Sequence, residues 1–168
     1  MNLLELFTPI RTFIFDVDGV LTDGSLLLME DCHMLRVMNI KDGYAMQYAV
    51  KQGYTIWIIS GGKSEAVKKR LNRLGIEEVH IGIENKKEFL IEIAEATNTP
   101  FSSMLYMGDD IPDYAAMQLC ALPCCPNDAV EEIKQVSKYI SPINGGLGCA
   151  RDVIEKVLKL NNHWHMPV

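Results

Sequence analysis

The chain has 168 residues, 48% hydrophobic and 23% charged, which predicts one globular domain over residues 1–168 with a core of its own. The net charge of −6 argues against nucleic acid or an anionic membrane as the main partner, although a metal ion and a few lysines could still receive a small anion. No apolar stretch approaches the roughly 20 residues that span a bilayer, and no signal-peptide pattern is present. Five cysteines without a C-x-x-C pair favour reduced thiols, and together these features predict a cytoplasmic location.

Strand and helix patterns alternate along the chain after an amphipathic arm at 1–11. Short apolar runs predict strands at about 12–16, 54–60, 76–81, 104–108, 121–123 and 139–140. Helical spacing, caps and glycine stops predict helices at about 42–50, 64–74, 86–96, 113–119, 128–137 and 149–160. This alternation predicts an α/β fold, a doubly wound, Rossmann-like parallel sheet with right-handed crossovers.

One stretch departs from the alternation. Residues 25–40 alternate in a β-favouring pattern with an acidic break at Glu30-Asp31, which is typical of a hairpin. The stretch lies where a doubly wound fold would place a helix. We therefore predict a hairpin flap at about 24–40, inserted over the strand ends, that acts as a lid or as a contact to another subunit.

Two carboxylates follow the first strand. Asp16 and Asp18 come directly after the apolar run 13–15, and Gly19 permits a turn that can bring both acids to one place. Open α/β sheets bind ligands at such strand ends, and Mg²⁺ prefers carboxylate and carbonyl oxygens. D-x-D-G also resembles the opening of a calcium loop, and a loop with two solvated aspartates is the simpler alternative.

The other strand ends carry matching polar groups. A hydroxyl and two glycines follow the second strand, an acidic cluster follows the fourth, and a lysine pair begins the helix between them. These residues are Ser60, Gly61, Gly62, Asp109, Asp110, Asp113, Lys86 and Lys87.

This order of aspartate, hydroxyl, lysine and acidic cluster resembles the haloacid dehalogenase (HAD) superfamily of phosphatases. Over nearly its whole length the chain is similar to the capless branch, whose best-known members are 3-deoxy-D-manno-octulosonate 8-phosphate (KDO 8-phosphate) phosphatases. The specific motifs are Asp16-x-Asp-Gly-Val-x-Thr-Asp-Gly, Gly108-Asp-Asp-x-x-Asp113 and Gly145-Gly-x-Gly-x-x-Arg151. The resemblance implies a Mg²⁺-dependent phosphomonoesterase acting on a small anionic keto-deoxy sugar acid phosphate. The first candidate substrate is the eight-carbon KDO 8-phosphate, and the alternative is the nine-carbon sugar acid phosphate KDN 9-phosphate.

The resemblance also implies roles for the acids. Asp16 attacks phosphorus and carries an aspartyl-phosphate, while Asp18 protonates the leaving oxygen and then acts as base on water. The Asp16 carboxylate, the Asp18 carbonyl and the Asp109 carboxylate hold Mg²⁺. Asp110 and Asp113 support the site from outside, one orienting water and the other the lysine, although Asp110 could instead be only a helix cap.

Substrate contacts follow from the same resemblance. Ser60, the Gly61 amide and Lys86 bind phosphoryl oxygens, and Arg70 meets the substrate carboxylate. Each has an alternative that sequence reasoning leaves open. Ser60 could be only the N-cap of the next helix, Lys86 could be solvated with Lys87 in its place, and Arg70 could be a helix-surface arginine.

Some features depart from the family or lie outside its site. The family commonly has charged residues where this chain has Gly62 and Leu147, which weakens the assignment of the sugar acid. His163 and His165 flank Trp164 at i, i+2 and could ligate a metal, but we expect a loose terminus.

Family members resemble one another in being homotetramers in which the hairpin and C-terminal segment of one subunit close a neighbour's site. Two other functions are alternatives to a phosphatase. One is a non-catalytic oligomerisation module, as in domains fused to nucleotidylyltransferases, and the other is a receiver-type signalling domain. The Asp18 acid and the absence of an output domain argue against the receiver.

Overall fold

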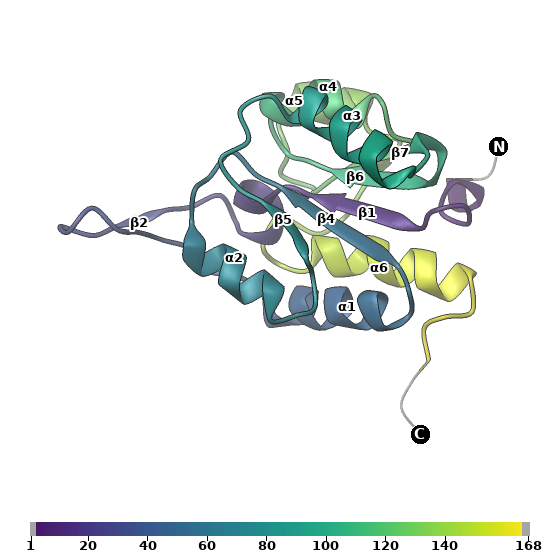
Figure 1. The fold of residues 1–168 in the computed structure, drawn as a ribbon, viewed down its shortest axis with the longest axis horizontal. Coiled ribbons are helices and arrows are strands. Elements are labelled where there is room, and N and C mark those ends of the chain that lie inside the picture. Colours follow the sequence, from purple (N-terminus) through teal and green to yellow (C-terminus); the bar gives the residue numbers. More distant parts are fainter. Residues whose placement is uncertain (1–2, 166–168) are drawn as a thin grey trace.

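A computed structural model describes residues 3–165, and its centre is a six-stranded sheet in which every neighbouring pair is parallel (Figure 1). The strands lie in the order β5-β4-β1-β6-β7-β8. Their bounds are β1 Thr12–Phe15, β4 Thr55–Ile59, β5 Glu78–His80, β6 Met104–Met107, β7 Leu122–Cys125 and β8 Tyr139–Ile140. The predicted doubly wound α/β fold is confirmed, and no cap domain accompanies the sheet within the described residues.

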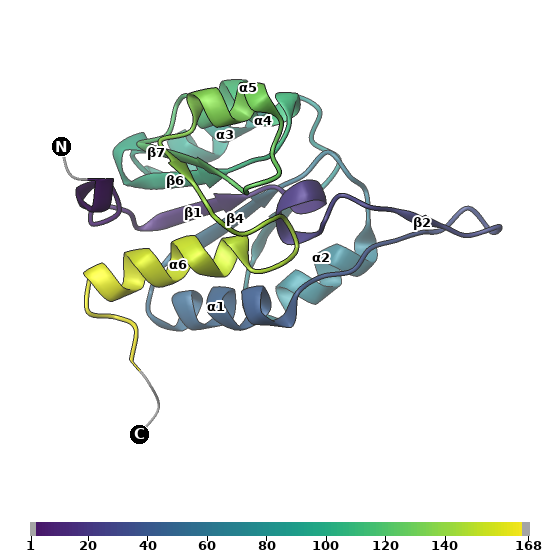
Figure 2. The same ribbon diagram turned by 180° about the vertical axis from the view of Figure 1, so that it is seen from behind.

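Helices cover both faces of the sheet, as Figures 1 and 2 show from opposite sides. One layer contains α1 (Ile40–Lys51), α2 (Glu65–Asn72) and α6 (Cys149–Leu160), and the other α3 (Lys86–Thr97), α4 (Ile111–Met117) and α5 (Glu131–Val136). Short helical segments lie at η1 (Leu3–Leu6), η2 (Val17–Leu21) and η3 (Phe101–Ser103). In β1, Phe13 and Phe15 pack in the core on the α1 side and Ile14 in the core on the α3 side. A central parallel strand is buried on both faces, which explains why Phe13, Ile14 and Phe15 follow one another without a polar residue. Over residues 3–165, no helix combines the length and apolarity needed to cross a bilayer.

The hairpin flap is present but differs from its predicted form. Only β2 (Leu27–Leu28) and β3 (Met34–Leu35) pair, and both strands are exposed because the flap extends away from the body (Figures 1 and 2). The predicted limit of about 40 lies where α1 begins. Asn39 accepts a hydrogen bond from the Lys41 amide at 2.8 Å and starts α1 at Ile40.

The C-terminal segment up to His165 is packed against the body, which corrects the expectation of a loose terminus. His163 Nδ1 lies 2.9 Å from the Tyr54 hydroxyl. Trp164 packs against Tyr48, with ring centroids 4.9 Å apart, and under the Arg151 guanidinium at 5.5 Å. Residues 166–168 of the predicted tail lie outside the described part of the chain.

The N-terminus of α6 supports the turn that follows β1. Gly146 N donates to the Val20 carbonyl at 2.9 Å, and Cys149 Sγ lies 3.2 Å from the same oxygen. A Cβ atom at Gly145 would overlap the Gly19 carbonyl oxygen. Only glycine therefore fits where the loop before α6 presses on the turn containing Asp18.

Asp42 supplies the cap that α6 lacks in its own sequence, since Gly148 at the N-cap has no side chain to offer. The Arg151 amide donates to Asp42 Oδ1 at 2.7 Å, whereas Asp42 Oδ2 is buried without a hydrogen-bond partner. Burial raises the pKa of Asp42 to about 6, and the Arg151 and Gly148 amides only partly oppose the rise.

Asp42→Asn keeps the cap acceptor and removes the charge, so we expect its effect to depend on pH. Because the folded-state pKa is about 6 and the unfolded value 3.8, stability from the protonated carboxyl is complete below about pH 4 and lost as pH rises through about 6. The asparagine variant should therefore gain about 2 kcal/mol relative to wild type between about pH 4.5 and pH 8. Urea unfolding at both pH values measures this, with exposed Asp31→Asn as control. A difference independent of pH would contradict it.

Candidate active site

Asp16 stands where β1 ends, between the ends of β4 and β6. Its amide donates to the Met107 carbonyl at 3.1 Å, which extends the pairing of β1 and β6 by one residue. Its Oδ1 accepts from the Val17 amide at 2.7 Å and begins η2, a helical segment that sequence reasoning did not predict. Gly19 interrupts that segment with a φ of +86°, as its proposed role in the turn requires.

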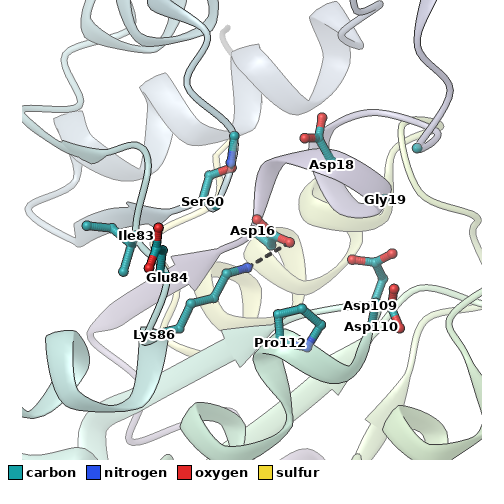
Figure 3. A pocket seen from close by; sticks show the side chains of 13 residues that line it. Asp16, Asp18, Gly19, Ser60, Ile83, Glu84, Lys86, Asp109, Asp110 and Pro112 are labelled. Atoms are coloured by element: carbon teal, nitrogen blue, oxygen red, sulfur yellow. Dashed lines mark hydrogen bonds and ion pairs between the residues drawn. The ribbon is translucent and has the colours of Figure 1, made fainter.

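Lys86 crosses from the start of α3 to the acids. Its Nζ lies 2.9 Å from Asp16 Oδ2 (Figure 3). The same atom lies 2.7 Å from Asp113 Oδ1, and the side chain is only 3% exposed. Burial disfavours the ammonium, but Asp113 and Asp16 outweigh burial and keep the pKa of Lys86 above its ordinary value. The alternative of a solvated Lys86 is wrong, because the exposed neighbour is Lys87.

Asp113 and Asp110 differ in burial and in the groups that they bind. Asp113 is fully buried and accepts from Lys86 and, at 2.9 Å, from the Tyr106 hydroxyl, so it orients the lysine. Asp110 is exposed at the cavity edge and caps α4 by accepting from the Ile111 amide at 2.8 Å. Asp110 is therefore a helix cap, and its orienting of water stays a prediction.

Asp109 offers an unused ligand atom. Its Oδ1 is buried and has no hydrogen-bond partner. Burial, then the nearby charges of Asp16 and Asp113, raises its pKa to about 8. Oxygens of Asp16, Asp109 and Asp113 all lie within 4.8 Å of one another. Three clustered carboxylates with a free oxygen fit a hard divalent cation, and Asp16 and Asp109 suit it better than Asp113, which already holds the lysine.

Asp18 lies apart from Asp16 and points away from it in Figure 3. Its carboxylate is held by Arg36, with Nε to Oδ1 at 2.6 Å and Nη2 to Oδ2 at 3.1 Å. Sequence reasoning missed Arg36. The only signal was that it is the single arginine in the stretch 25–40.

A cavity of about 530 Å³ opens over these groups. Ser60 and Gly61 line one wall, and Ser60 Oγ accepts from the Gly62 amide at 3.2 Å. The N-cap alternative for Ser60 is wrong, because Ser64 caps α2. The remaining lining residues are Asp16, Asp18, Gly19, Gly24, Gly62, Ile83, Glu84, Lys86, Asp109, Asp110 and Pro112 (Figure 3).

Arg70 is not brought into this cavity. It lines a neighbouring pocket of about 260 Å³ between α2 and the hairpin base, and its guanidinium lies against Gly43 of α1. Its contact with a substrate carboxylate therefore stays a prediction. Of the two positions that depart from the family, Gly62 lines the cavity and Leu147 does not.

Comparisons with known proteins agree with this geometry. No family model matches the sequence. The 3-deoxy-D-manno-octulosonate 8-phosphate phosphatase KdsC of Escherichia coli (strain K12) is 32% identical over 149 residues, which cover 89% of this chain and 79% of that protein.

Solved structures of the same kind of phosphatase are also similar to this chain. The chain superposes on the 3-deoxy-D-manno-octulosonate 8-phosphate phosphatase of Moraxella catarrhalis, in complex with magnesium, phosphate and KDO, with a TM-score of 0.92 and 30% identity over 96% of this chain and 93% of that one. A structure from Legionella pneumophila described as a HAD superfamily (subfamily III A) hydrolase matches with a TM-score of 0.92 and 27% identity, covering 95% and 88%.

Proposed function

Because the chain belongs to the 3-deoxy-D-manno-octulosonate 8-phosphate phosphatase family of the HAD superfamily, we propose that it releases phosphate from a keto-deoxy sugar acid phosphate. KDO 8-phosphate is the leading substrate and KDN 9-phosphate the alternative. The observation that carries the proposal is the buried Asp16–Lys86–Asp113 cluster, with Asp109 beside it, at the floor of an open cavity.

The residues divide the chemistry of an in-line displacement. Asp16 attacks phosphorus and receives the phosphoryl group as an aspartyl-phosphate. Lys86, Ser60 and Gly61 line the cavity, and the ammonium, the hydroxyl and the Gly61 amide would bind the phosphoryl oxygens there. Asp18 gives a proton to the leaving oxygen and later takes one from the water that cleaves the aspartyl-phosphate.

The charge of the cavity argues for a bound cation. Its described lining includes five acids and one lysine, and a phosphate dianion would be repelled by that balance. Asp16, the Asp18 carbonyl and Asp109 would hold Mg²⁺, and the unpartnered Asp109 Oδ1 supports this choice. When bound, the ion would neutralise the phosphoryl oxygens and lower the barrier to attack. The magnesium in the Moraxella catarrhalis complex supports the same ion here.

A non-catalytic assembly module is the weaker candidate. Burying two carboxylates and an ammonium carries a desolvation cost, and assembly alone would give no reason to retain it. The buried cluster therefore favours catalysis over the module.

Phosphate release from a panel of sugar phosphates with Mg²⁺ tests the proposal. The panel contains KDO 8-phosphate, KDN 9-phosphate and simple hexose phosphates. We expect strong preference for one keto-deoxy acid. Release from none of them would overturn the phosphatase, and equal weak release from all would overturn the substrate class.

The hairpin supports a homotetramer in which neighbouring subunits close the site. Its apolar side chains face solvent in the single chain, with Leu28 69% and Val37 81% exposed. A projecting apolar hairpin of this kind is typical of a protein–protein contact.

Leu28→Asp is expected to disperse the assembly, because a charge would have to be buried in the contact. Light scattering after size exclusion should show about a fourfold lower mass than wild type if the tetramer falls to monomers. Exposed Glu30→Gln on the same hairpin is the control. A wild-type protein that is already monomeric would contradict the tetramer.

A further inference from the structure

Arg36 enters the site from the hairpin rather than from the sheet. It follows β3 directly, yet its side chain is only 8% exposed, in contrast to the hairpin residues around it. Nε and Nη2 donate to the two oxygens of Asp18, and Nη1 donates to the Met34 carbonyl at 3.2 Å. All three guanidinium nitrogens thus have partners on the chain itself, and the two-point contact fixes the plane of the carboxylate.

The space for this contact depends on Gly62. A Cβ atom there would lie 3.1 Å from Asp18 Oδ2 and 3.3 Å from Arg36 Nη2. A longer side chain at position 62 would therefore press on the ion pair. The absence of a side chain leaves room for the arginine from the hairpin beside Ser60.

The ion pair holds the Asp18 carboxylate turned away from Asp16 (Figure 3). In an in-line displacement the nucleophile and the leaving oxygen lie on opposite sides of phosphorus. Asp16 stands on the cavity floor, and the Asp18 carboxylate is held away from it (Figure 3). With a carboxylate that is one-third exposed, Asp18 would otherwise be free to change rotamer.

We propose that Arg36 is a positioning residue for Asp18, which makes the orientation of the acid–base group depend on the placement of the hairpin. The inference rests on the proposed function, because it takes Asp18 as the group that protonates the leaving oxygen. Burial of the hairpin against another subunit would then order the acid in the same step as it closes the site.

A double-mutant cycle with Arg36→Ala and Asp18→Ala tests the inference. We expect Arg36→Ala to lower kcat by about 10- to 100-fold on the preferred sugar phosphate and to change KM by less than roughly threefold. In the Asp18→Ala background, Arg36→Ala should have no further effect. Arg36→Lys keeps the charge but loses the two-point contact, so its kcat should lie between those of wild type and Arg36→Ala. Lys41→Ala, which removes an exposed charge at the start of α1, is the control.

Amide hydrogen exchange tests the Arg36–Asp18 contact without an enzyme assay. Arg36→Ala and Asp18→Ala should each speed exchange at the base of the hairpin, and the double variant should add nothing. Effects on kcat that multiply in the double variant, or a large rise in KM, would overturn the inference and make Arg36 a substrate contact.

Failure of the proposed function would look different. A wild-type protein that releases no phosphate from any compound would overturn the phosphatase alone. The exchange experiment would then decide on the ion pair, and unchanged exchange in both single variants would overturn the inference about Arg36.

Discussion

Replacement of Asp16 by asparagine should lower Mg²⁺-dependent phosphate release by about 10³-fold or more. No other acid of the cluster is placed to substitute for it. Asp113 is held by Lys86 and Tyr106, and Asp109 has the unpartnered oxygen that we propose as a cation ligand. Burial and then the charge of Asp113 raise the pKa of Asp16 to about 7, although Lys86 opposes the rise. A bound cation would further favour the ionised carboxylate that the proposed attack requires.

Two measurements check the role of Asp16. Initial rates give the loss of turnover, and mass spectrometry of acid-quenched wild type should find the phosphoryl group on the peptide containing Asp16. Asp31→Asn on the exposed hairpin tip is the matched control. A variant that keeps more than about a tenth of the rate would place the nucleophile elsewhere.

Magnesium should raise the melting temperature of the wild-type protein, and Asp109→Asn should remove most of that effect. We expect the variant to bind Mg²⁺ about 100-fold more weakly, because the uncharged amide replaces the one cluster acid with an unused oxygen. Titration calorimetry and thermal unfolding with and without Mg²⁺ measure the two effects. Exposed Glu131→Gln on α5 is the control, and equal binding by wild type and Asp109→Asn would contradict the assigned ligand.

The pH dependence of that binding has a definite sign. In the metal-free protein the pKa is about 7 for Asp16 and about 8 for Asp109, both above the unfolded 3.8. Protonation therefore stabilises the metal-free fold most at low pH, and this contribution is lost as pH rises through 7 to 8. Mg²⁺ has to displace those protons, so its affinity should fall as pH is lowered from about 8.5 to about 6.

The strand-end residues could be predicted because their positions follow from local sequence. Asp16 and Ser60 come directly after a short apolar run, and Asp109 follows another with one glycine between. Parallel strands bring their carboxyl ends to one edge. Lys86 could be found because it begins a helix next to that edge. The helical segment η2 could not be predicted from the sequence, because its φ and ψ angles depart from helical geometry at Asp18 and Gly19.

Other parts of the site depend on contacts between distant segments, which spacing does not encode. Arg36 reaches Asp18 across 18 residues, and nothing in an alternating exposed hairpin shows which side chain turns inward. Arg70 could be placed on a helix but not on the face toward Gly43. The packing of Trp164 against Tyr48 likewise depends on how α6 lies beside α1.

The glycines that press on the turn after β1 also fix when the site can form during synthesis. The acids at 16 and 18 are made first, whereas Gly145, Gly146 and Cys149 contact their turn from much later in the sequence, with Cys149 129 residues after Val20. Contacts over such a separation close late, because a long loop has to be ordered first. A chain still emerging from the ribosome could hold β1 and β4 before the turn with Asp18 is supported, and we expect the proposed cation site to form only as α6 docks.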